Sequence, residues 1–440
     1  MAKRWITEWR PDDPGFWEHD GKRVARRNLV FSVFAEHLGF TVWTVWSIVA
    51  VKLGSYEFST DQLFWIVSLP NLVGSALRIP YTFGPAKFGG RNFTVASALL
   101  LLVPAALLAV AVSDPATPYW VFLAIAATAG LGGGNFASSM ANITYFYPQA
   151  KQGSALGLNA AGGNIGVSSV QLFMPLVIGA FGLAAAGLFW IPFILAAAAG
   201  AYFFMDNLTV AKADPRAQLK IAGRAQTWIM AVLYIGTFGS FIGYSTAFPL
   251  LINSQFPEQA SLVTLAFLGP LVGSLIRPAG GWLADRIGGS RVTLVNFGAM
   301  AGAVALVWQG LVQQSFALFF CSYMLLIATT GVGNGSTYRM IPAIFRAKAT
   351  AGIRAGTPAH EAALAVGKRD ASAAVGLISA IGAFGGFFIN RGFGSSIAAT
   401  GGAGAALASF AGFYVLCAFI TWACYLRTAG RVPSLAAARV

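Results

Sequence analysis

Long, uninterrupted apolar segments recur along almost the whole chain, and this feature limits the fold more than any other. Twelve segments are long enough for a helix to cross a bilayer, which takes about 20 residues. We place them at approximately 28–52, 62–83, 93–113, 119–141, 153–179, 182–204, 227–252, 261–284, 291–312, 316–344, 371–391 and 405–426. Because the apolar residues are continuous rather than alternating, a membrane β-barrel is excluded. The sequence therefore predicts an all-α membrane protein with twelve transmembrane helices.

Charged residues are few and unevenly placed. They make up 10% of the chain, and the net charge is +14. Lys and Arg gather in the N-terminal segment, the C-terminal tail and alternate loops, whereas the loops of the other side hold only Lys52 and Arg391. Cytoplasmic loops are the ones enriched in Lys and Arg, so we expect a multi-pass protein of the cell inner membrane with both termini cytoplasmic. The basic composition thus reflects topology in a lipid bilayer and gives no reason to expect a nucleic-acid partner.

The chain is organised as a doubled six-helix unit. Shifting residues 69–91 by 199 positions aligns LVGSALR (72–78) with LVGSLIR (271–277). We expect two pseudo-symmetric six-helix bundles, with the polar segment 346–370 connecting helices ten and eleven. The predicted parts are a cytoplasmic N-terminal segment (1–27), an N-terminal bundle (28–204), a cytoplasmic linker (205–226), a C-terminal bundle (227–426) and a cytoplasmic C-terminal tail (427–440).

Arg78 and Arg277 occupy equivalent places in this repeat, each inside an apolar segment. A charge there costs roughly 2.5–3.5 kcal/mol even on lenient insertion scales, so such residues usually serve a function. The predicted spans contain one carboxylate away from their ends, Glu36, so acids on their own helices do not neutralise the arginines. Parallel repeats place a substrate site near the bilayer midplane between the halves, where the two arginines would face each other. A guanidinium is a flat fork of donors that suits a planar oxyanion such as nitrate, nitrite or a carboxylate.

Other classes of function find less support. The chain has only three His and three Cys, scattered without metal-ligand spacing, and it shows no nucleophile or cofactor motif. We expect no enzyme activity, no cofactor and no metal, and a monomer as the working form. From the arginines alone, a small-carboxylate transporter and an anion channel stay open as alternatives.

One loop resembles a known family signature. GGWLADRIGGSR (280–291) is similar to the loop between helices eight and nine of the major facilitator superfamily, while the equivalent first-half loop GPAKFGGR (84–91) lacks the aspartate. The resemblance implies the major facilitator fold and a gating role for Gly281, Asp285 and Arg286. Arg339, near the end of helix ten, is expected to extend toward the membrane surface.

Longer stretches resemble the bacterial nitrate/nitrite porters of that superfamily. They are NFASSMANITYFYP (135–148), QGSALGLNAAGGNIGVSSVQ (152–171) and GLISAIGAFGGFF (376–388). The resemblance implies that Phe136 and Phe238 sandwich the anion, that Tyr234, Asn164 and Ser379 donate hydrogen bonds to it, and that Gly376 lies beside it. Ala160 and Ala161 stand where relatives often have glycine, which leaves the preference for nitrate or nitrite open.

The energy source of transport is the remaining question. Members of the family that lack an ionisable residue in the first helix resemble nitrate/nitrite exchangers, because two fixed positive charges cannot return empty without cost. This chain has Glu36 and His37 in its first predicted span, and this titratable pair could couple nitrate uptake to protons. We expect nitrate/nitrite exchange by alternating access, with proton-coupled nitrate symport through Glu36 as the alternative.

Overall fold

A computed structural model of the chain describes residues 5–211, 220–354, 356–427 and 440. The central part of the predicted linker, at 212–219, and most of the predicted tail, at 428–439, lie outside the described residues. The chain divides into two compact units, each held together mainly by contacts within itself. The N-terminal unit comprises Met1–Ala213, Thr246–Ser254 and Ala260–Phe267, and the C-terminal unit comprises Asp214–Ser245, Gln255–Gln259 and Leu268–Val440.

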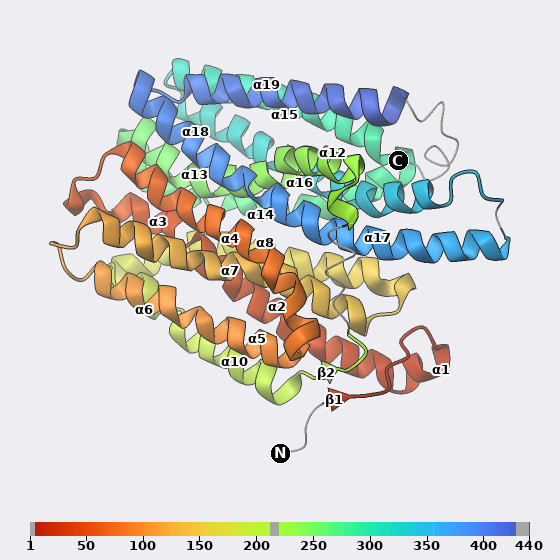
Figure 1. The fold of residues 1–440 in the computed structure, drawn as a ribbon. Helices are drawn as coiled ribbons and strands as arrows, with labels where there is room; N and C mark the ends of the chain where they lie inside the picture. The colour runs from red at the N-terminus through yellow and green to blue at the C-terminus, as the bar shows by residue number, and fades with distance from the viewer. Residues whose placement is uncertain (1–4, 212–219, 355, 428–439) are drawn as a thin grey trace. The chain divides into compact units, whose positions relative to one another are not determined.

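In the first half, the described regular elements are helices and helical turns, with two short strands (Figure 1). Its strands are β1 (Trp5–Ile6) and β2 (Asn207–Leu208), which pair in parallel. Its helices are α1 (Pro14–Phe16), a π-helical turn (Trp17–Gly21), α2 (Lys22–Thr44), α3 (Trp46–Val49), the 3-10 turns Ala50–Lys52 and Gly54–Tyr56, α4 (Thr60–Phe88), α5 (Gly90–Leu100), α6 (Leu102–Ala111), α7 (Tyr119–Phe146), α8 (Gln149–Phe181), α9 (Ala185–Leu188) and α10 (Ile191–Phe204).

In the second half, every described element is helical. These elements are α12 (Ala225–Tyr234), a π-helical turn (Ile235–Gly239), α13 (Ser240–Gln255), a 3-10 helix (Pro257–Leu265), α14 (Leu268–Ile287), α15 (Gly289–Val312), α16 (Phe316–Ala349), α17 (Pro358–Ala383), α18 (Gly385–Thr400), α19 (Gly404–Thr421) and a π-helical turn (Trp422–Leu426).

The number of membrane-length helices agrees with the predicted architecture. Within the described ranges, 11 spans are long and apolar enough to cross a membrane, and the pair Pro257–Leu265 and Leu268–Ile287, bent by 41°, brings the number to 12. The eighth helix therefore starts later than the predicted residue 261, because a 3-10 helix precedes it.

The eleventh helix differs most from its predicted range of 371–391. It begins at Pro358, where the Thr357 side chain accepts a hydrogen bond from the backbone N–H of His360 at 3.2 Å. A Thr N-cap followed by Pro is a strong helix start, and the alanine-rich stretch after it favours helix. The predicted polar connection at 346–370 is thus largely helical.

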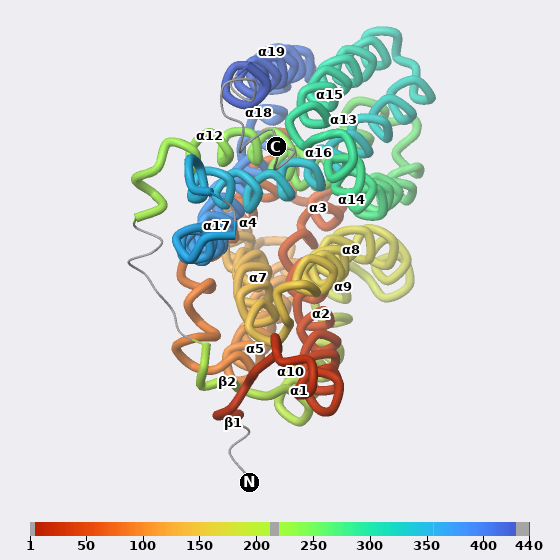
Figure 2. Tube along the Cα trace, turned by 90° about the vertical axis from the view of Figure 1, so that its right-hand side faces the viewer, coloured from red at the N-terminus to blue at the C-terminus, as the bar shows by residue number. Residues whose placement is uncertain are grey.

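Inside the N-terminal unit, α7 packs against both α2 and α4 (Figure 2). Glycines permit the close approach of α7 to α4, since a Cβ on Gly133 would lie 2.8 Å from the Cα of Gly74. Such small residues at helix contacts are the usual means of tight packing in membranes.

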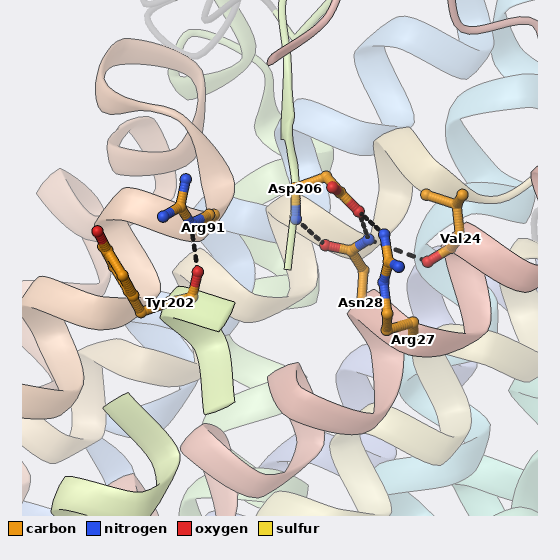
Figure 3. Close-up of polar contacts among 6 residues, drawn as sticks. All are labelled: Val24, Arg27, Asn28, Arg91, Tyr202 and Asp206. Atoms are coloured by element: carbon orange, nitrogen blue, oxygen red, sulfur yellow. Dashed lines mark hydrogen bonds and ion pairs between the residues drawn. The ribbon is translucent and has the colours of Figure 1, made fainter. Parts of the chain in front are cut away.

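The segment that follows α10 is fastened to the start of α2. Arg27 forms an ion pair of 2.5 Å with Asp206, and Asn28 both donates to the Asp206 carboxylate at 3.1 Å and accepts from its backbone N–H at 2.9 Å (Figure 3). Nearby, Arg91 donates to the carbonyl of Tyr202 at 2.8 Å. The beginning of the predicted linker is therefore an ordered part of the N-terminal unit.

Candidate functional site

Arg78 lies fully buried on α4, inside the N-terminal unit. Its Nε donates to the carbonyl of Gly133 at 3.2 Å, and its guanidinium carbon lies 4.5 Å from the centre of the Phe136 ring and 5.4 Å from that of Trp43. Cation–π contacts of this kind strengthen when they are removed from water. The structure thus brings Arg78 and Phe136 together, with Trp43 as a second aromatic partner that was not predicted.

Two buried asparagines add unsatisfied polar groups to this unit. Asn164 on α8 is fully buried, and neither its amide nitrogen nor its amide oxygen has a hydrogen-bond partner in the described chain. The same is true of both amide atoms of Asn135, on α7 next to Phe136. A buried polar group without a partner costs about 1–3 kcal/mol, so such groups point to a ligand or to water.

Arg277 lies on α14 in the C-terminal unit and is 8% exposed. Its guanidinium carbon is 5.4 Å from the centre of the Tyr338 ring. Among the described residues, its Nη1 has no hydrogen-bond partner and no carboxylate forms an ion pair with it. A buried guanidinium in this condition favours an incoming anion.

Tyr234 immediately precedes the π-helical turn Ile235–Gly239 that joins α12 to α13, and Phe238 lies within that turn. Their rings stack with centres 5.3 Å apart, and Tyr234 lies 6.2 Å from Tyr338, the ring beside Arg277. Single π-helical turns occur often at functional sites because they reorient side chains within a helix. The turn brings two predicted residues into the aromatic group around Arg277.

Two predicted donors have protein partners in this structure. The Tyr234 hydroxyl donates to Asn334 Oδ1 at 2.9 Å, and the Ser379 hydroxyl donates to the carbonyl of Gly376 at 3.0 Å. Both side chains are buried. To bind an anion, each hydroxyl must turn away from this partner.

Asn334 was not among the predicted site residues, although the sequence repeat points to it. The shift of 199 positions that aligns the two arginines also aligns Asn135 with Asn334, and Gly132 and Gly134 with Gly331 and Gly333. The repeat therefore extends to the fourth and tenth helices. Both units carry a buried asparagine at the equivalent place on the helix that packs against their arginine-bearing helix.

The residues of the predicted gating loop contact neighbours on their own unit. Asp285 accepts a hydrogen bond from Nε of Arg339 at 2.7 Å, so Arg339 is held by this carboxylate rather than simply extended toward the membrane surface. The guanidinium of Arg286 lies 4.1 Å from the centre of the Trp282 ring. At Gly281, an added Cβ would be 3.8 Å from the carbonyl oxygen of Gly335, an ordinary contact. This loop therefore joins the end of α14 to α16 through one charged pair.

Glu36 and His37 face different partners on α8. Asn159 donates to Oε2 of Glu36 at 2.6 Å and to the Ser139 hydroxyl at 2.5 Å, and Ser139 is 2.9 Å from Ser32. Nδ1 of His37 lies 3.0 Å from the carbonyl of Gly162, so this nitrogen carries the ring proton. Glu36 thus belongs to a buried chain of polar side chains from α2, α7 and α8.

Comparison with known proteins places this arrangement in a family. Residues 29–357 match the model of the Major Facilitator Superfamily. The chain is 44% identical to the nitrate/nitrite transporter NarU of Salmonella typhimurium, with 96% of each chain covered. It is 36% identical to the probable nitrate/nitrite antiporter NarK2 of Thermus thermophilus, with 98% of each covered.

The chain belongs to the nitrate/nitrite porter family of the major facilitator superfamily. This membership confirms the family and the fold that the sequence motifs indicated. The members of this family are transporters and not enzymes. Solved structures support the fold. A bacterial homologue of the human lysosomal transporter Spinster matches with a TM-score of 0.63 at 16% identity, covering 90% of this chain and 95% of its own. The xylose transporter XylE of E. coli matches with a TM-score of 0.63 at 12% identity, covering 91% and 98%.

Close helix contacts hold the Tyr234 and Phe238 group of this porter in place. A Cβ on Gly239 would lie 2.5 Å from the carbonyl oxygen of Gly382 and 2.6 Å from the Cα of Gly385. Because these are backbone atoms, no rotamer change can relieve the clash. We expect Gly239→Ala to destabilise the protein by about 1–3 kcal/mol and to impair transport.

Thermal unfolding in detergent measures this effect. The matched control is Gly298→Ala, since an added Cβ there meets nothing within 4 Å and the position is helical. An unfolding temperature of Gly239→Ala equal to that of the control would show that the contact does not fix the helices.

Proposed function

We propose that this protein is a secondary active transporter that exchanges nitrate and nitrite across the cytoplasmic membrane by alternating access, with both termini in the cytoplasm. The observation that carries the proposal is Arg277, a buried guanidinium beside an aromatic ring, whose Nη1 has no hydrogen-bond partner among the described residues. A planar anion supplies both the missing negative charge and the missing acceptors. The names of the relatives, nitrate/nitrite transporters and antiporters, support the same substrates.

In this proposal, Arg78 and Arg277 hold the charge of the anion. Phe136 and Phe238 cover its flat faces and keep water away, which strengthens the attraction between arginine and anion. Asn164, Tyr234 and Ser379 donate hydrogen bonds to its oxygens, and Gly376 leaves room beside it. The amide of Asn164, unpaired in the described chain, is the donor most directly available.

Exchange follows from the fixed charge of the two arginines. Because guanidinium groups stay protonated, the binding groups become uncompensated cations each time the anion leaves. Returning the empty carrier with these buried charges costs free energy. A second anion that binds before the return step removes this cost. Nitrate and nitrite have the same charge and a similar planar shape, so either can serve as cargo in either direction.

Counterflow in liposomes tests the proposal directly. We expect nitrite loaded inside to accelerate the entry of labelled nitrate by tenfold or more over empty liposomes, because the loaded carrier returns without a bare charge. Equal entry rates with and without internal nitrite would identify a channel or uniporter. Strong competition by external formate or acetate would instead identify a small-carboxylate transporter.

Proton-coupled nitrate symport is the second candidate, and the buried Glu36 favours it. Nitrate is the anion of a strong acid and cannot carry a proton at physiological pH, so symport needs a titratable group on the protein. Glu36 is almost completely buried and accepts a hydrogen bond from Asn159. It also lies one helical turn from Phe40, whose ring centre is 6.1 Å from that of Phe136. Phe40 and Phe136 thus connect the helix segment that carries Glu36 to the ring that lies against the Arg78 guanidinium.

A further inference from the structure

A pocket of about 490 Å³ opens at the N-terminal end of α2. It is formed by the π-helical turn that precedes α2 and by the first turns of α2 itself. Its lining residues are Glu18, His19, Lys22, Arg23, Arg26, Arg27, Val30 and Phe31. None of them belongs to the anion site proposed above.

The charge of the pocket is strongly positive. Its lining contains four Lys and Arg side chains and one carboxylate, Glu18, which lies 3.6 Å from Lys22 and 3.8 Å from Lys151 on α8. Arg27 is held by Asp206 (Figure 3), whereas Arg23 and Arg26 are exposed. The pocket therefore suits a ligand with negative charge spread over several oxygens, such as a phosphate group.

The other end of the pocket is apolar and continues onto the outside of the helices. Val30 is 54% exposed, and Phe31 stacks on Phe204 of α10 with ring centres 5.0 Å apart. Phe204 and its neighbour Phe203 are themselves exposed. A free phosphate ion would leave this apolar surface uncovered, while an acyl chain would cover it.

We propose that this pocket binds the headgroup of an anionic glycerophospholipid, with its acyl chains lying along Val30, Phe31 and Phe204. Cations clustered at the end of a membrane-spanning helix attract anionic lipid headgroups. The pocket adjoins the Arg27–Asp206 pair, so a bound lipid supports the contact between α2 and the segment after α10. The proposal does not depend on the identity of the transported anion.

Native mass spectrometry of the delipidated full-length protein tests the site, with phosphatidylglycerol and phosphatidylcholine as the probes. We expect phosphatidylglycerol to bind more tightly than phosphatidylcholine, and Arg23→Ala/Arg26→Ala to weaken its binding roughly 30-fold, the loss typical of two juxtamembrane cations. Arg27 is left intact because it fastens Asp206. The matched control is Lys348→Ala/Arg354→Ala, which removes two exposed cations from the C-terminal unit.

Two further measurements show whether the pocket prefers a phosphate group carried by a lipid or one carried by a small soluble molecule. We expect glycerol 3-phosphate at the same concentration to displace little lipid, and Val30→Ser to weaken lipid binding without changing the affinity for glycerol 3-phosphate. Equal losses in the pocket variant and the control variant would overturn the proposal. So would equal binding of both lipids, or displacement of the lipid by glycerol 3-phosphate alone at equal concentration.

Discussion

Nitrate transport is expected to fall at least about 100-fold in Arg277→Lys and in Arg78→Lys, while both variants enter the membrane in normal amounts. Lysine keeps the positive charge but loses the flat fork of donors. In Arg78→Lys the Nε bond to the Gly133 carbonyl and the planar contact with Phe136 disappear together. A hydrogen bond to a charged group contributes about 1.5–3 kcal/mol, so the loss of one or two such bonds accounts for this factor.

The measurement is the initial rate of labelled nitrate entry into nitrite-loaded liposomes, normalised to the reconstituted protein. Arg91→Lys is the matched control, because Arg91 also donates through Nε to a carbonyl and lies 4.5 Å from the Tyr202 ring, but at the start of α5. We expect it to transport at close to the normal rate. Normal flux in Arg78→Lys and Arg277→Lys would remove both residues from the anion site.

The parts of the fold that depend on local sequence could be predicted. Membrane helices follow from runs of apolar residues, and the doubled architecture follows from the repeat that relates Arg78 to Arg277. The cost of a charge inside an apolar helix is enough to single out both arginines from the sequence alone. Helix ends were less predictable, as α17 shows, because they depend on single capping residues such as Thr357.

Contacts between distant residues could not be predicted in the same way. Trp43 and Tyr338, the rings beside the arginines, are ordinary aromatic residues in apolar helices, and only packing brings them to a guanidinium. The pairing of Asp285 with Arg339 needs α14 and α16 to lie side by side, which no local pattern specifies. The family resemblance supplied Phe136, Phe238 and Asn164, since single residues of these types are common in membrane helices.

Glu36 shows both what local sequence can predict and what only the fold reveals. The sequence singled it out as a carboxylate inside an apolar helix, and its burial agrees with that interpretation. Its partner Asn159 lies 123 positions away on α8, so the hydrogen bond between them appears only in the fold. The same packing depends on Gly163, because a Cβ there would collide with the Glu36 carboxylate. The fold thus gives the isolated acid a fixed donor and a closely packed neighbour on α8.

The second large effect concerns this carboxylate and separates symport from exchange. If the protein couples nitrate uptake to protons, we expect Glu36→Gln to abolish uptake driven by an acidic exterior into liposomes that contain no nitrite. Glutamine preserves the size of the side chain and can accept the hydrogen bond from Asn159, but it cannot bind and release a proton. Nitrate/nitrite exchange should continue at close to the normal rate, because both half-reactions carry an anion and need no proton.

Two assays on each protein distinguish proton-coupled symport from exchange. Uptake under a pH gradient and counterflow without a gradient are measured for the natural chain, Glu36→Gln and the control Glu258→Gln, which neutralises an exposed carboxylate. Loss of counterflow in Glu36→Gln would assign Glu36 to packing or gating, while gradient-driven uptake that survives the change would place the proton elsewhere. If the natural chain shows no gradient-driven uptake at all, exchange alone is its mechanism, and Glu36 then serves to hold Asn159 and Ser139 between α2, α7 and α8.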